Sequence, residues 1–185
     1  MPVLVYAEHL QGRFKKSAFE IVSYGAAIAS GLQTTLVAIS IGDVEDSELQ
    51  LLSKYGADKI LTVKGPEYSA TDVQPYAAAI AQASKVTAAS VVVMSASFSG
   101  KAIAPRVAVK LEASFGDNVI DLPHMDTAFI VKKNSYSGKA FSMVELLAPV
   151  KVISVLPNAF KLAEQPKPAA VETFTPVLTP ADTLL

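Results

Sequence analysis

Short runs of consecutive apolar residues alternate with longer amphipathic segments over most of the chain. The runs lack polar alternation, which predicts strands buried on both faces, and they lie at residues 3–7, 36–41, 59–63 and 91–94. The amphipathic segments predict helices over residues 17–30, from 46 or 47 to 55, from 71 or 72 onward, and from about 100 to 111. Strands that alternate with helices of this length predict right-handed βαβ crossovers and a parallel sheet covered on both faces.

Local signals place the ends of these helices. Gly31 fits the left-handed exit position after the first helix, and Gly56 is the expected stop of the second. Ser47-Glu-Leu-Gln50 has the spacing of a capping box at the start of the second helix. Pro75 is tolerated in the first turn of the third helix, because that turn has no intrahelical donor to lose.

The pattern changes after Gly116. Residues 128–136 and 140–147 flank Ser137-Gly138-Lys139, a short glycine-containing link that predicts an antiparallel hairpin, and residues 150–155 form one last apolar strand. The expected fold is therefore a three-layer α/β/α domain over residues 1–160, with a mainly parallel sheet and an antiparallel hairpin extension. Residues 161–185 are rich in proline and are expected to lie outside that core as a connector.

Composition narrows the function classes. The hydrophobic fraction is 51%, the formal charge is -1 and cysteine is absent. A near-neutral chain without a basic cluster is not expected to bind nucleic acid, and thiolate chemistry is excluded. The first apolar run is too short for a signal peptide or a membrane span, so we expect a cytoplasmic protein that is not itself a membrane protein.

The turn after the fourth predicted strand carries the candidate cofactor-binding residues Ser97, Gly100 and Lys101. Ligands of open α/β sheets bind at such carboxyl ends, and backbone N–H groups there can hold an anion. The turn lacks the earlier glycine of a P-loop, and Ala102 stands where Ser or Thr would contact magnesium. Lys101 and Arg106 diverge around a helix, so a capped strand-to-helix turn is the favoured interpretation.

Other residues that could carry chemistry do not form a recognisable motif. His9 and His124 are far apart and have no metal-ligand spacing, so no metal site is expected. No Ser lies in a Gly-x-Ser-x-Gly elbow, and no catalytic residue is expected. Tyr24, Tyr55 and Tyr76 fall within predicted helices and are expected to pack rather than to stack on a cofactor.

Five segments taken together resemble the alpha subunit of electron-transfer flavoproteins, in order from residue 1 to about 160. They are Val3-Leu-Val-Tyr-Ala-Glu-His9, Tyr55-Gly-Ala-Asp-Lys-Ile60, the segment from Gly100 to Leu111, Tyr136-Ser-Gly-Lys-Ala140 and Val150-Lys-Val-Ile-Ser-Val155. The chain looks like the amino-terminal domain of that subunit, which is similar in fold to the adenine-nucleotide alpha-hydrolase-like domains. In the family this domain is regarded as structural.

The resemblance implies a heterodimer with a beta subunit, in which FAD accepts electrons from acyl-CoA or other dehydrogenases and passes them to a respiratory acceptor. The family binds FAD mainly on a carboxy-terminal domain with Gly-rich turns, and no matching turn follows Pro157. FAD is therefore expected in the intact complex and not on this segment alone. The chain departs from the family pattern at Lys139, where Asn is typical, and at Leu156, where Arg is common, so partner contacts through those positions are not carried over.

Two other classes of function remain as alternatives. The first is a stand-alone adenine-nucleotide-binding module of the universal-stress-protein type, with phosphate on the turn at 97–101. The second is a receiver-like signalling domain, for which Glu8 and Asp43 are the nearest acidic candidates.

The resemblance also implies something about the connector at residues 161–185. Within it, residues 171–178 are expected to form a strand that pairs only with a flavin domain or another partner.

Overall fold

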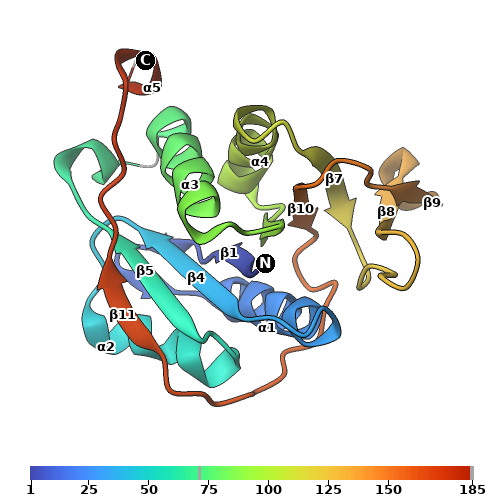
Figure 1. Cartoon of the computed structure of the whole chain (residues 1–185), viewed down its shortest axis with the longest axis horizontal. Coiled ribbons are helices and arrows are strands. Elements are labelled where there is room, and N and C mark those ends of the chain that lie inside the picture. The colour runs from blue at the N-terminus through green and yellow to red at the C-terminus, as the bar shows by residue number, and fades with distance from the viewer. Residues whose placement is uncertain (71, 184–185) are drawn as a thin grey trace.

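The computed structural model describes residues 1–70 and 72–183, which form a sheet between two layers of helices (Figure 1). The sheet strands are β1 Val3–Tyr6, β4 Leu36–Ile41, β5 Lys59–Val63, β6 Val91–Ser95, β7 Ser114–Val119, β8 Ile130–Ser135, β9 Ala140–Glu145, β10 Lys151–Val155 and β11 Ala170–Thr173. They run in the order β11-β5-β4-β1-β6-β10-β7-β8-β9. Neighbouring strands are parallel except at β7–β8 and β8–β9. This confirms the predicted three-layer fold and its antiparallel hairpin.

Helices cover both faces of the sheet. One face carries α1 Lys16–Gly31, α2 Asp46–Leu49 and the 3-10 helix η1 Gln50–Tyr55, and the other carries α3 Val73–Thr87 and α4 Phe98–Lys110. The remaining elements are a hairpin of β2 His9–Leu10 and β3 Arg13–Phe14, the 3-10 helices η2 Pro66–Tyr68 and η3 Tyr136–Gly138, and α5 Pro180–Thr183. Across the described ranges, no helix combines the length and apolar character that a membrane crossing requires.

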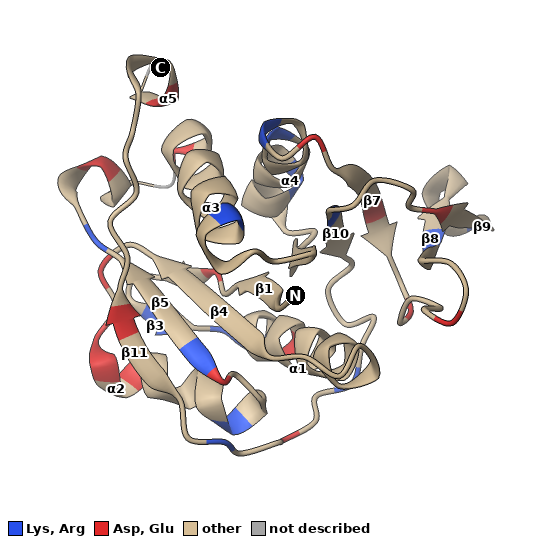
Figure 2. Cartoon of the chain, viewed as in Figure 1, with Lys and Arg blue, Asp and Glu red and all other residues tan. Residues whose placement is uncertain are grey.

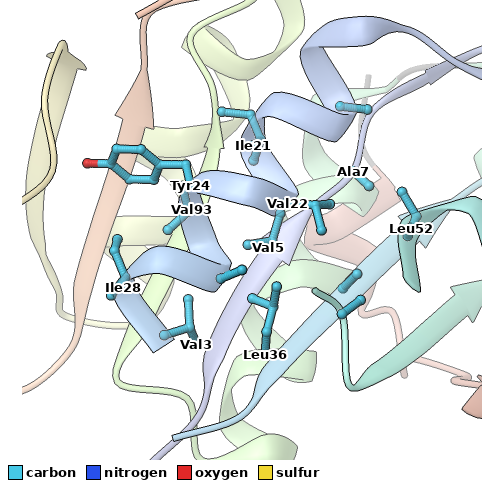
Figure 3. Packing of buried hydrophobic residues seen from close by; sticks show 14 of the residues in the cluster. Val3, Val5, Ala7, Ile21, Val22, Tyr24, Ile28, Leu36, Leu52 and Val93 are labelled. Carbon is cyan, nitrogen blue, oxygen red and sulfur yellow. The ribbon is translucent and has the colours of Figure 1, made fainter. Parts of the chain in front are cut away.

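Strand β1 lies at the centre of the sheet and is buried on both faces. Val3 and Val5 pack with α1, as Figure 3 shows, while Leu4 and Tyr6 belong to the cluster beneath α3 and α4. At Gly25 of α1, a Cβ atom would lie 2.3 Å from Val5 Cγ2, so the helix approaches the strand more closely than alanine would allow. Continuous apolar runs such as β1 predict this two-sided burial, which the structure confirms.

Several helix ends differ from the sequence prediction. Gly31 is the last residue of α1, and the left-handed conformation falls instead on Gln33, with φ of 51°. The capping box at Ser47 does not form: Glu45 precedes α2 without a side-chain cap, and the helix tightens to η1 after one turn. Asp72 caps α3 through a 3.2 Å hydrogen bond from Gln74 N, whereas the alternative start at Thr71 lies outside the described residues.

Strand β7 has no counterpart in the sequence prediction. It contains Gly116, Asp117 and Asn118, residue types with low strand propensity, and Asn118 has a positive φ of 50°. The strand exists because β10 pairs with it in parallel and β8 pairs with it antiparallel. Contacts distant in sequence therefore override a weak local preference.

The expectation that residues 161–185 lie outside the core is corrected for the described part of that segment. Buried Glu20 of α1 accepts backbone N–H groups from Asn158 at 3.0 Å and Phe160 at 2.9 Å, and Ser23 bonds both backbone groups of Ala163. The chain then passes η1 and forms β11, which extends the sheet beside β5 (Figure 1). Strand β11 pairs with β5 of this chain, so the expectation that residues 171–178 pair only with a flavin domain or another partner is wrong for residues 171–173.

The last described residues continue across the helices on the opposite face. The Gln82 side chain of α3 bonds the backbone N–H of Val177 at 2.8 Å and its carbonyl at 2.7 Å. Asp182 is buried, accepts from Thr179 and forms a 2.6 Å ion pair with Lys110 of α4. Residues 161–183, here called the C-terminal strap, therefore contact both helical layers and one edge of the sheet.

Asp182→Asn is expected to release the end of the C-terminal strap. Hydrogen bonds from Lys110 and Thr179 lower the Asp182 pKa from 3.8 to about 2, because they favour its ionised form. Stability from such a carboxylate is present above its unfolded pKa and is lost as the pH falls through the folded value, so the wild-type strap end should detach between about pH 4 and pH 2.

NMR signals of residues 177–183 across this pH range would measure the release. Thr183→Ala is the matched control, because among the described residues the Thr183 hydroxyl donates to the Pro180 carbonyl alone, at 3.1 Å. Unchanged strap signals in Asp182→Asn at neutral pH would contradict the expectation.

Candidate functional site

A cleft lies where β1 and β6 end. The connections from these two strands lead to opposite sides of the sheet, and this switch point is where open α/β folds bind ligands. The cleft has a volume of about 480 Å³ and draws its lining from the segments after both strands and from the first turns of α1, α3 and α4. Its lining residues are Glu8, His9, Leu10, Lys15, Ser17, Val73, Ser97, Phe98, Ser99 and Ala102.

The carboxylate of Glu8 lies at the N-terminus of α4. Ser97 Oγ donates to Glu8 Oε2 at 2.6 Å, and Ser99 Oγ donates to Glu8 Oε1. Ser97 is also the N-cap of α4, since its Oγ accepts from Gly100 N at 3.0 Å. A helix N-terminus favours negative charge, and here the protein supplies that charge itself. A phosphate at this place would meet the Glu8 carboxylate.

Of the three candidate residues of this turn, Ser97 lines the cleft, whereas Gly100 and Lys101 do not. A Cβ atom on Gly100 would lie 1.9 Å from the Ser95 carbonyl oxygen, so glycine is required there for the close approach of α4 to β6. Lys101 is exposed and does not line the cleft, and Arg106 bonds the Ala102 carbonyl of its own helix at 2.8 Å. The structure therefore brings Ser97 into the cleft but does not assemble an anion clamp from Lys101 and Arg106.

His9 is held by two backbone partners in the β2–β3 hairpin. Its Nε2 lies 2.8 Å from the Ile41 carbonyl, and its Nδ1 accepts from Gly12 N at 3.1 Å. Because a carbonyl only accepts and a backbone N–H only donates, these contacts assign the proton to Nε2. Both ring nitrogens are thus engaged in positioning the hairpin, which the sequence analysis did not anticipate.

The remaining candidates lie apart from the cleft. His124 is exposed and forms an isolated antiparallel bridge with Ile130. Asp43 lines a different hollow from Glu8, and its carboxylate faces Lys64 at 3.8 Å, so the two acids do not form the pair of a receiver domain. In residues 1–70 and 72–183, no three His, Cys, Asp or Glu side chains form a group that could hold a metal ion.

The three tyrosines pack within the fold, as predicted. Tyr24 is fully buried, donates to the Asp121 carbonyl at 2.8 Å, and has its pKa raised by burial. Tyr76 is 3% exposed and contacts the ring of Tyr6 edge-on. Tyr55 stacks on Phe19 with ring centroids 4.7 Å apart.

Sequence reasoning missed two parts of the cleft. Lys15 and Ser17 reach it because the β2–β3 hairpin turns the chain back before α1. Phe98 is fully exposed at the rim, directly after the helix cap. An aromatic residue beside a capping serine was the available signal, but the start predicted for α4, near Gly100, placed Phe98 in a loop.

Comparison with known proteins places the chain in a family. The family model "Electron transfer flavoprotein domain" matches residues 3–178. An electron transfer flavoprotein subunit alpha from Bacillus subtilis (strain 168) is 25% identical over 163 residues, which are 88% of this chain and 50% of that protein. The corresponding subunit from Pseudomonas aeruginosa is 28% identical over 183 residues, or 98% and 56% of the two chains. The acryloyl-CoA reductase electron transfer subunit beta from Anaerotignum propionicum is 26% identical over 124 residues, or 67% and 33%.

The match includes every strand of the sheet from β1 to β11, so the chain belongs to the electron transfer flavoprotein domain family. Its resemblance to the amino-terminal domain of the alpha subunit is confirmed. The chain spans about half the length of the two alpha subunits that it matches.

The cleft does not fit FAD, the flavin dinucleotide that the resemblance to the family implies. Proteins hold a pyrophosphate with Gly-rich turns and free N–H groups at a helix N-terminus. Here Glu8 and two serines fill that position, and Gly100 is needed for packing against Ser95. Lys15 lines the cleft from the start of α1, but at the N-terminus of α4 a pyrophosphate would meet the negative charge of Glu8.

Ser97→Ala is expected to lower the free energy of unfolding by about 1 kcal/mol, because it removes the N-cap of α4 and one donor to Glu8. Lys101→Ala, on the exposed side of the same helix, should change it by less than about 0.5 kcal/mol. Urea denaturation followed by circular dichroism measures both. Equal stability of Ser97→Ala and the wild type would rule out the capping role.

Proposed function

We propose that the chain is the structural and subunit-assembly domain of an electron-transfer flavoprotein alpha subunit. In this role it supports FAD-mediated transfer of electrons from acyl-CoA or other dehydrogenases to a respiratory acceptor. The domain binds the beta subunit in a heterodimer, and FAD is held elsewhere in the complex. It supplies no catalytic residue, because the flavin carries the redox chemistry.

The observation that carries this proposal is the family match across the whole sheet, combined with a switch-point cleft in which Glu8 takes the place of a bound anion. A domain that keeps this fold, but places a carboxylate where other open α/β folds bind phosphate, is suited to a scaffold role. The C-terminal strap supports the same role: its contacts with Glu20, Gln82 and Lys110 fix its path over the domain.

Two further parts of the proposal concern the connector at residues 161–185 and the compartment in which the protein acts. Residues 161–185 act as a connector toward a flavin-binding domain; their described part lies against the present domain through β11 and through the contact of Asp182 with Lys110. The protein acts in the cytoplasm.

The purified chain is expected to be colourless and to bind the beta subunit of the same organism. Gel filtration with detection at flavin wavelengths tests the first part, and isothermal titration calorimetry with the beta subunit tests the second. A flavin band that stays with this chain alone through gel filtration would contradict the scaffold role. Lack of binding to the beta subunit would contradict the assembly role.

The stand-alone adenine-nucleotide module is the second candidate, because a cleft of about 480 Å³ lies at the switch point. The Glu8 carboxylate disfavours it by repelling phosphate, so calorimetry with ATP and AMP is expected to show no binding heat. Micromolar binding that is weakened by Ser97→Ala, in the lining of the cleft, would instead establish the nucleotide module.

A further inference from the structure

The two edges of the sheet differ in how they are protected. At one edge, β11 has four residues, its Glu172 pairs with Lys59 at 2.7 Å, and Pro168 and Pro176 lie on either side of it. Figure 2 shows acidic residues on both β11 and α2 at that end of the sheet. Short length, charge and nearby proline are the features by which proteins prevent further strand pairing. At the opposite edge, β9 has six residues and no proline.

The side chains of β9 leave an apolar face uncovered. Its burial alternates along the strand, so that Val144 packs toward the core while Phe141 is 63% exposed and Met143 is 54% exposed. Beyond the strand, Leu147 is 80% exposed. Lys132 of β8 lies over the Phe141 ring, 5.0 Å from its centroid, which holds the ring in place on this face.

The backbone of β9 is also open along its outer side. Leu146 N donates to Phe129 O at 2.8 Å, and the register pairs Val144 with Val131. Alternate residues of an antiparallel strand direct their N–H and C=O groups to the same neighbour, so Phe141 and Met143 direct theirs away from β8. A further extended strand would find both backbone groups and apolar side chains at these two positions.

The charged residues beside this edge favour a partner strand that carries an acidic residue. Lys133 is paired with Asp117, but Lys132 and Lys139 have no carboxylate within 4 Å among the described residues. Glu145 lies at the far end of the strand. A complementary strand therefore carries apolar residues opposite Phe141 and Met143 and an acidic residue near Lys139.

We propose that the outer edge of β9 is the surface to which the beta subunit adds an extended, partly acidic strand. This inference rests on the proposed function, which requires such a partner, and it goes further by naming the surface and the mode of binding. Strand addition gives affinity through main-chain hydrogen bonds and specificity through alternate side chains. The protected edge at β11 leaves β9 as the place where the sheet is extended.

Calorimetry of the chain with the beta subunit of the same organism tests the proposal in the variant Met143→Lys. A lysine at the centre of an edge strand opposes pairing, so the dissociation constant should rise at least tenfold. Val86→Lys is the matched control, because Val86 is 73% exposed on α3 and receives the same change far from β9. Amide hydrogen exchange provides a second readout: the N–H groups of Phe141 and Met143 should become protected when the beta subunit binds.

The outcomes separate this inference from the proposed function. If the wild type binds the beta subunit but Met143→Lys binds equally well and the two amides stay unprotected, the edge is not the interface and the assembly role stands. If the wild type does not bind the beta subunit, both fail. If the chain alone forms a dimer in sedimentation that Met143→Lys dissociates, the edge serves a second copy and the inference is overturned.

Discussion

The fold depends on burying β1 on both faces at the centre of the sheet. Val3 and Val5 contact one helical layer and Leu4 and Tyr6 the other, so this strand contributes to the cores beneath both layers. Parallel pairing on both sides then requires crossover helices, which places the ends of β1 and β6 at the switch point. The position of the cleft is a consequence of that burial rather than of any local motif.

At the cleft, electrostatics decides what the fold can bind. The N-terminus of α4 would attract an anion, but Glu8 extends from the end of β1 and is bonded by Ser97 and Ser99. A carboxylate from the segment after the central strand thus ties the first turn of α4 to the end of β1. The same geometry that serves ligand binding in other α/β proteins here stabilises the domain itself.

The C-terminal strap shows how buried polar groups can fix the path of a segment that contains little regular secondary structure. Glu20 and Asp182 are buried carboxylates at the two ends of its path, each satisfied by several hydrogen bonds, and β11 lies between them. Because β11 of the strap forms a protected edge at one side of the sheet, β9 at the opposite side is the edge that is left open to a further strand.

Local sequence determined the four apolar strands, the helices between them and the hairpin, because each has a pattern that burial imposes along the chain. The five segments that resemble electron-transfer flavoprotein alpha subunits, which include most of α4, also indicated the family. Tertiary structure alone decided that β7 is a strand, that β11 pairs with β5, and that Glu8 meets Ser97 and Ser99. These contacts join residues far apart in sequence, and their stability comes from partners that no local pattern specifies.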